Sequence, residues 1–354
     1  MSNCHSNQNP GIEASHHERD TLTPTVKLDL LSSRETNDDR KLEADRLLTQ
    51  GIEDYQQGQL QTALHTLQKA QLIYWELEDQ VGAEKALNYL GLACYGLGEY
   101  GKAIDYAQRS LALAEQIKNY LSRVHVLGTM GNAYRHLADH GKAIEYQQES
   151  LVLAQHLQDR PGEMAALNNL GLAYKAAGQS DCAIGCKQAA LAIAQDLNDY
   201  KAQGQILKNL GNAFYAQGDY DLAIAYYQHR LVLAQTVQDQ RLEAQVLRNL
   251  GNAYYVLGNH DQAITYNRQR LTLAIALKDL RSQENALASL CVSYDALGQM
   301  TEAIECYEQR LRLAQQIGDC RLEEHILGSL KRACFLLGDY ARANRYSQRE
   351  AIVL

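Results

Sequence analysis

The sequence predicts an all-α protein, a superhelical solenoid built from eight stacked helix-turn-helix units. Only 3 of its 354 residues are Pro, which favours helix because Pro breaks helices and marks strand edges. Two small residues also recur in a fixed register, with no insertion between repeats. Glycine falls at residues 51, 91, 131, 171, 211 and 251, and alanine at 63, 103, 143, 183, 223, 263, 303 and 343. Such a period indicates repeats that bury their apolar faces against their neighbours.

The first helix of each unit is marked by an apolar stripe. In the sixth unit, Leu247, Leu250, Gly251 and Tyr254 follow one another at three- and four-residue steps. This spacing places them on one face of a helix. Gly258 comes next and is expected to end the helix, because glycine adopts the left-handed conformation of a C-terminal cap.

The second helix of the unit is predicted to begin near His260 and to end near residues 278–279. Ala263, Ile264 and Ala274 form its apolar positions. Asp or Asn then recurs at residues 79, 119, 159, 199, 239, 279 and 319. These side chains are suited to cap the first helix of the following unit, because they accept hydrogen bonds from free backbone amides.

A glycine in the middle of a helix, such as Gly251, costs about 1 kcal/mol relative to alanine. Its recurrence therefore needs a compensating contact. We expect close approach of the two helices of a unit, with Ala263 and its equivalents as the small surface on the facing helix. Residues 41–354 then form one repeat array, whose eighth unit stops inside its second helix. Residues 1–40 are polar and charged and are expected to form a disordered N-terminal arm.

The pattern Leu247, Leu250, Gly251, Tyr254, Gly258 and Ala263 resembles the tetratricopeptide repeat. The usual repeat has about 34 residues, and this longer form is similar to the LGN/Pins-like and bacterial multi-repeat subclass. The resemblance covers about residues 41–354. It implies a right-handed superhelix that binds other proteins, and it names no pathway.

Composition argues against several other functions. The net charge of −8 does not suit a general nucleic-acid binder. No apolar run approaches the roughly 20 residues of a membrane span, and the N-terminus does not read as a secretory signal. The expected location is the cytoplasm, with no membrane insertion. No phosphate loop, catalytic triad or metal-ligand spacing occurs, so we expect no enzyme activity, no catalytic residues, no metal and no cofactor.

The concave wall of the superhelix is expected to come mainly from the first helix of each unit. The resemblance points to particular positions of that helix outside its apolar stripe. In the third to sixth units these positions are rich in amides, basic residues and Tyr. The predicted peptide-binding residues are Arg135, Asn168, Asn169, Lys175, Lys208, Asn209, Asn212, Tyr215, Arg248, Asn249, Asn252 and Tyr255.

The predicted concave wall differs in charge from the acidic chain as a whole. Six basic side chains occupy it against Asp295 alone, namely Lys85, Arg135, Lys175, Lys208, Arg248 and Arg332. Such a groove favours an acidic peptide, and Asn offers both a donor and an acceptor to an extended backbone. The alternative is a solvated face whose Asn residues are inherited with the repeat. The seventh and eighth units, with Ser289, Ser329 and Asp295, favour neither interpretation.

The sequence therefore predicts an adaptor or scaffold that binds an extended, acidic peptide segment of another protein. Three alternatives stay open. They are a peptide-responsive regulatory sensor, a chaperone for assembly of a larger complex such as a photosynthetic one, and a scaffold that self-associates through its C-terminal repeat. The last rests on the apolar end at residues 351–354, where repeat arrays normally carry a polar cap.

Overall fold

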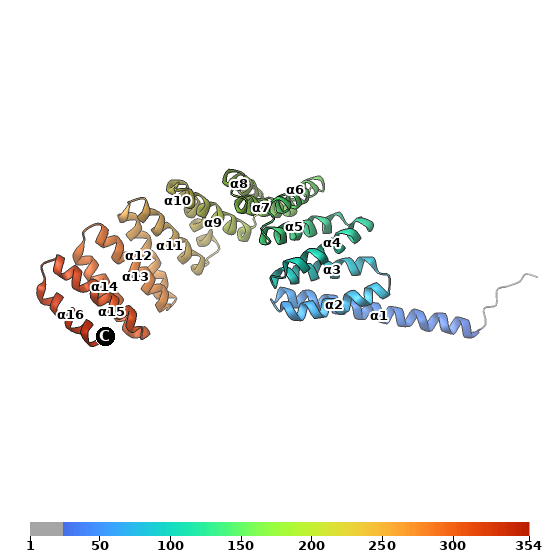
Figure 1. Cartoon of the computed structure of the whole chain (residues 1–354), viewed down its shortest axis with the longest axis horizontal. Coiled ribbons are helices and arrows are strands. Elements are labelled where there is room, and N and C mark those ends of the chain that lie inside the picture. The colour runs from blue at the N-terminus through green and yellow to red at the C-terminus, as the bar shows by residue number, and fades with distance from the viewer. Residues whose placement is uncertain (1–23, 354) are drawn as a thin grey trace, which may run out of the picture.

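The computed structural model describes residues 24–353, with side chains described for residues 37–350. It contains eight successive helix pairs, and no strand occurs within residues 24–353 (Figure 1). The all-α solenoid is confirmed. The helices are α1 (Pro24–Gln56), α2 (Leu60–Glu76), α3 (Gln80–Gly96), α4 (Tyr100–Gln116), α5 (Tyr120–His136), α6 (His140–His156), α7 (Arg160–Ala176), α8 (Ser180–Asp196), α9 (Tyr200–Gln217), α10 (Tyr220–Thr236), α11 (Gln240–Val256), α12 (His260–Ala276), α13 (Leu280–Ala296), α14 (Met300–Ile317), α15 (Cys320–Leu336) and α16 (Tyr340–Val353).

The predicted caps define the helix boundaries. Asp239 precedes α11, and its Oδ1 accepts a hydrogen bond from the backbone N of Leu242 at 2.9 Å. The Asp or Asn at each equivalent position from 79 to 319 caps its helix in the same way. Gly258 follows α11 with φ of 84°, a left-handed conformation that glycine adopts without steric cost.

The turn between units also passes through the left-handed region, without using glycine in most repeats. Lys278 has φ of 54°, and Glu78, Lys118, Gln158, Asn198 and Gln238 have similar values. A different turn, the one inside the third unit between α5 and α6, has Ala138 in place of glycine, with φ of 61°. These residues hold a conformation that is unfavourable for side chains with a Cβ, so packing of the flanking helices must offset the cost.

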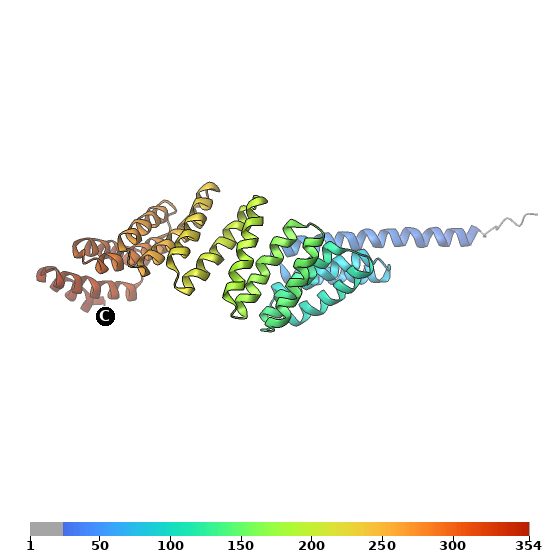
Figure 2. The same cartoon turned by 90° about the horizontal axis from the view of Figure 1, so that it is seen from above.

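Each helix packs against the next along the chain, and the pairs form an arch (Figure 1). The odd-numbered helices α7, α9 and α11 lie toward its inner side, as predicted for the first helix of each unit. Figure 2 shows the same helix pairs turning about the long axis of the array. Leu247, Leu250 and Ala263 are fully or almost fully buried in the interior between the helices. Stacked rings reinforce the pairs, for example Tyr254 on Tyr266 with centroids 5.3 Å apart.

The central glycines do mark the closest approach within a pair, but the facing residue differs from the one expected. A Cβ at Gly171 would lie 3.0 Å from the carbonyl oxygen of Ala183, which fits the predicted contact with the alanine column, and equally close to Cγ of Lys187. In most other units the glycine faces a side chain 16 residues further on. A Cβ at Gly211 would lie 2.5 Å from Cε1 of Tyr227.

The N-terminal boundary also differs from the expectation. Helix α1 begins at Pro24, so residues 24–40 are helical, whereas the sequence predicts a disordered arm there. This part of α1 extends beyond the stacked pairs (Figure 2). Residues 1–23, the rest of the expected arm, lie outside the described residues, as do the side chains of residues 351–354 on which the self-association hypothesis depends.

Candidate functional site

The predicted peptide-binding residues lie along the odd-numbered helices α5, α7, α9 and α11, and none of them is fully buried. Four are exposed, namely Lys175, Asn212, Arg248 and Asn252. The other eight are half-buried, namely Arg135, Asn168, Asn169, Lys208, Asn209, Tyr215, Asn249 and Tyr255.

Pockets between neighbouring odd-numbered helices bring some of these residues together. One pocket of 350 Å³ joins Asn169 of α7 to His125 and Asn132 of α5. A second, of 250 Å³, places Asn252 and Tyr255 of α11 opposite α13. No described pocket combines all twelve predicted residues, which are spread over four helices. The predicted site is therefore an extended face with local hollows.

Several predicted residues already contact other parts of the chain. The hydroxyl of Tyr227 donates to Oδ1 of Asn212 at 2.7 Å, and Nζ of Lys187 donates to Oδ1 of Asn168 at 3.4 Å. The ring of Tyr215 packs edge-on against Tyr220, with centroids 5.2 Å apart. These contacts occupy acceptors of two asparagines but leave their amide donors free to reach a ligand.

Tyr227 and Lys187 belong to the second helices of their units, yet they reach asparagines of the concave face. Each passes the central glycine of its pair, Gly211 or Gly171, where a missing Cβ leaves room. Lys187 is only 2% exposed. Burial lowers the pKa of its ammonium to about 8, and the nearby positive charges of Lys175 and Arg135 act in the same direction. The concave wall is thus partly built from helices that the sequence did not assign to it.

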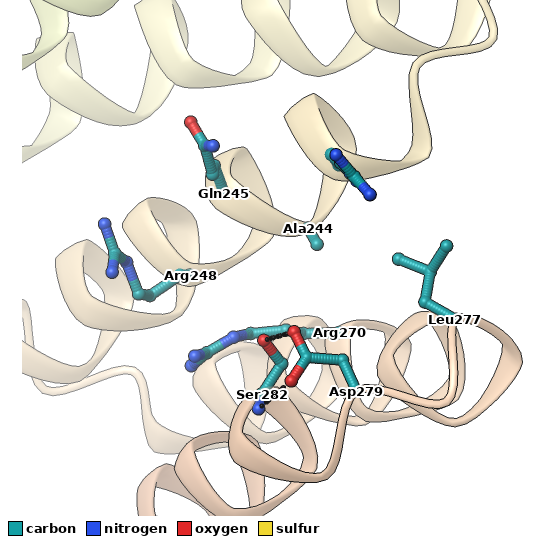
Figure 3. Close-up of a pocket in the computed structure, with 8 residues that line it drawn as sticks. Ala244, Gln245, Arg248, Arg270, Leu277, Asp279 and Ser282 are labelled. Carbon is teal, nitrogen blue, oxygen red and sulfur yellow. Dashed lines mark hydrogen bonds between the residues drawn. The ribbon is translucent and has the colours of Figure 1, made fainter.

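Three arginines line a pocket of 360 Å³ between α11 and the start of α13 (Figure 3). Gln245 and the predicted site residue Arg248 project from α11 on one side. Arg270, Asp279 and Ser282 lie together on the other side. The pocket is lined by Arg241, Ala244, Gln245, Arg248, Arg270, Leu277, Asp279 and Ser282.

Charge in this pocket is dominated by three arginines against one carboxylate. Asp279 caps α13, and its two oxygens accept from the backbone N of Ser282 at 3.0 Å and from its Oγ at 2.6 Å. These hydrogen bonds lower the pKa of Asp279 and hold its charge at the helix start. Arg270 is 7% exposed, and its pKa is lowered by burial and by the charge of Arg248. An anionic group would be attracted to such a site.

Arg270 is not among the predicted site residues, because those all lie on the first helix of a unit and Arg270 lies on a second helix. A signal was nevertheless available. Arginine occupies the same position of the second helix in three successive units, at Arg230, Arg270 and Arg310. The recurrence of arginine at this position of the second helix could have identified Arg270 as a candidate site residue.

The fold and its concave face define a class, that of helical-repeat proteins. Within that class the family is shown by the sequence itself. Models of the tetratricopeptide repeat match residues 84–117, 120–196, 202–276 and 286–321, which is more than half of the chain. The chain belongs to the tetratricopeptide repeat family.

Solved structures with the same fold are distant in sequence. A signal transduction ATPase with a tetratricopeptide repeat sensor from Pyrococcus horikoshii is 18% identical, with a TM-score of 0.61 over 94% of this chain and 50% of its own. This chain therefore spans half the length of that protein. The apo quorum sensor NprR from B. thuringiensis is 15% identical, with a TM-score of 0.54 over 93% and 92%. The apo form of RapI is 16% identical, with a TM-score of 0.55 over 78% and 99%.

These likenesses support the fold alone, because all three identities are low. No curated protein matches the chain. Within the described residues, no helix has both the length and the apolar character needed to cross a bilayer.

Proposed function

We propose that this protein is a non-enzymatic scaffold that binds an acidic, extended peptide segment of a partner protein on the concave face of its repeat array. One observation carries the proposal. The pocket between α11 and α13 gathers Arg241, Arg248 and Arg270 in a protein whose overall charge is −8. Local positive charge in a concave, partly desolvated site selects for acidic ligands.

The amides along the same face support binding of an extended backbone. Asn249 and Asn252 flank Gly251 on α11, and Asn209 and Asn212 flank Gly211 on α9 in the same way. An asparagine side chain provides one acceptor and two donor hydrogens. A ladder of such groups, one pair per repeat, suits the repeating amides of a peptide.

The test is crosslinking capture from the native cell, followed by binding measurements with the purified partner. Lys208→Glu together with Arg248→Glu should remove binding, because both charges on the concave face are reversed. The matched control is Lys69→Glu with Arg312→Glu, which changes two exposed side chains on the even-numbered helices α2 and α14. This control pair should bind as the wild type does.

Circular dichroism melting should be almost unchanged in both double variants, because the four positions are exposed or half-buried. Wild-type binding should also weaken with salt, since part of the attraction is Coulombic. A verified partner that binds Lys208→Glu/Arg248→Glu with wild-type affinity would refute the proposed face.

A second candidate is a peptide-responsive sensor. The quorum sensor NprR and a protein with a tetratricopeptide repeat sensor have the same fold, so the fold is compatible with this role. The two candidates differ in one observable. A sensor should change its curvature when the peptide binds, which small-angle X-ray scattering detects as a change in radius of gyration, whereas a scaffold should keep the free shape.

A further inference from the structure

The same position of the second helix is arginine in three consecutive units, at Arg230, Arg270 and Arg310. Only the seventh unit shows how such an arginine is neutralised. In the seventh unit, Nε of Arg310 on α14 donates to Oε1 of Glu284 on α13 at 2.7 Å. Glu284 is 7% exposed, so this is a largely buried ion pair. A buried charge of this kind requires a partner, because its desolvation is otherwise uncompensated.

The preceding unit keeps the arginine and lacks the carboxylate. The residue equivalent to Arg310 is Arg270, and the residue equivalent to Glu284 is Ala244, 40 residues earlier in each case. Within residues 37–350 no salt bridge joins Arg270 to an acidic side chain. Glu284 acts on Arg270 through its charge, but the hydrogen bond of that carboxylate is made with Arg310. Both Arg270 and Ala244 line the 360 Å³ pocket between α11 and α13.

The fifth unit also has a buried arginine with a small residue in place of the glutamate, and its arginine is less exposed than Arg270. Arg230 is 4% exposed, and its Nε and Nη1 have no hydrogen-bond partner among the described residues. Gly204 takes the place of Glu284, and a Cβ there would meet only Cδ2 of Leu233, at 3.5 Å. Two neighbouring units therefore share a buried arginine and a small residue where the seventh unit has a glutamate.

We propose that the pocket at Arg270 is a carboxylate-binding subsite, in which a carboxylate of the bound peptide takes the role that Glu284 plays for Arg310. The proposal rests on the proposed peptide-binding function and names the group that the peptide must present. Arg270 supplies the buried donor, and Arg248 and Arg241 add positive charge at the mouth of the pocket. Guanidinium groups match the planar geometry of a carboxylate and bind it through charge-assisted hydrogen bonds.

The carboxylate can come from an acidic side chain or from the end of a peptide, and three short peptides distinguish the sources. The first is Gly-Glu-Gly blocked at both ends, the second is Gly-Gln-Gly blocked at both ends, and the third is Gly-Gly-Gly with a free carboxyl end. Binding is followed by the Nε–H resonance of Arg270 in arginine-labelled full-length protein, assigned by its loss in Arg270→Met.

We expect a saturable shift of the Arg270 resonance with the glutamate peptide, the free-carboxyl peptide or both, and none with the glutamine peptide. A shift with only one of the two acidic peptides identifies the source of the carboxylate. Equal behaviour of the glutamate and glutamine peptides, or no shift with either acidic peptide, would overturn the proposal.

The seventh unit provides a matched design for a second test. Ala244→Glu places an internal carboxylate in the register that Glu284 occupies, so it should weaken binding of the acidic peptides by about ten-fold or more. It should also raise the melting temperature, because Arg270 gains a partner. Ala244→Gln fills the same space without charge, so it should weaken binding less than Ala244→Glu does. Glu284→Ala should create a second subsite at Arg310.

Acidic peptides that bind Ala244→Glu as tightly as the wild type contradict the proposal. If Ala244→Glu does not fold, Arg270→Met decides, because it removes the charge and keeps an unbranched side chain. Binding of the acidic peptides to this variant is measured by isothermal titration calorimetry, and binding as tight as that of the wild type overturns the subsite. If the peptide tests give these contrary results while Lys208→Glu/Arg248→Glu still loses partner binding, only the subsite at Arg270 is refuted. Retained partner binding in that double variant would refute the proposed face as well.

Discussion

Gly211 on α9 lies directly against the ring of Tyr227 on α10, so that a Cβ at residue 211 would stand 2.5 Å from Cε1 of that ring. The hydroxyl of Tyr227 continues past the glycine and donates to Oδ1 of Asn212 at 2.7 Å. Burial raises the pKa of Tyr227 to about 12, so the hydroxyl keeps its proton and remains a donor at neutral pH. The repeat glycine thus makes room for a side chain of the second helix that orients an asparagine of the concave face.

Gly211→Ala should destabilise the protein, because neither the rigid ring of Tyr227 nor the α9 backbone can move away cheaply. Overpacking of this kind costs about 1–3 kcal/mol, and Gly211→Leu should cost at least as much. The measurement is urea denaturation followed by circular dichroism.

Gly91→Ala is the matched control for Gly211→Ala. It occupies the same register position, but its nearest neighbour would be the carbonyl oxygen of Ala103 at 3.4 Å, and residue 107 opposite it is alanine. The higher helix propensity of alanine should make this change neutral or stabilising by up to about 1 kcal/mol. Equal free energies of unfolding for the two alanine variants would contradict the packing derived from Gly211 and Tyr227.

Ala138→Gly should stabilise the third unit. Ala138 has φ of 61° in the turn between α5 and α6, where the other described units have glycine with φ between 69° and 84°. Relief of the left-handed penalty is worth about 1–2 kcal/mol, reduced by the extra freedom of glycine in the unfolded chain. A rise in melting temperature is therefore expected. Gly98→Ala, at the same position of the preceding unit, should shift the melting temperature downward; a rise there would show that the φ argument fails.

Lys187→Met should stabilise the protein near neutral pH and lose this advantage at high pH. The pKa of Lys187 is about 8 in the folded protein, against an ordinary value of 10.5. Between these values the unfolded chain binds more protons than the folded one, so the free energy of unfolding rises with pH. Below about pH 8 the cost of the buried ammonium is fully present, on the order of 1–3 kcal/mol.

The check for Lys187→Met is a pair of urea titrations, at pH 7 and at pH 10, for the variant and the wild type. The difference in unfolding free energy should shrink at pH 10. Lys69→Met, at an exposed position on α2, is the control and should change little at either pH. A constant difference across the two pH values for Lys187→Met would show that its ammonium is not penalised by burial.

Much of the fold could be predicted from the sequence because it depends on local chemistry repeated in register. Leu247 and Leu250 identify the buried stripe of α11, Asp239 identifies its start, and Gly258 identifies its end. Each of these signals acts within a few residues along the chain. The boundary of the first helix is different: the polar composition of residues 24–40 suggested a disordered arm, whereas α1 runs through them from Pro24.

The sequence by itself determined the repeat, the helix pairs and the family, because a 40-residue register needs no knowledge of what packs against what. It also placed polar and basic residues on the first helices of the units, such as Arg248 and Asn252 on α11. Only the tertiary structure decided which side chains of the second helices reach the same face. Tyr227 and Lys187 pass beside Gly211 and Gly171, and Arg270 lies buried beside Ala244 where the next unit has Glu284. The physical reason is that burial and charge compensation depend on which helices meet in space. The repeat pattern along a single helix does not reveal which side chains it meets on its neighbours.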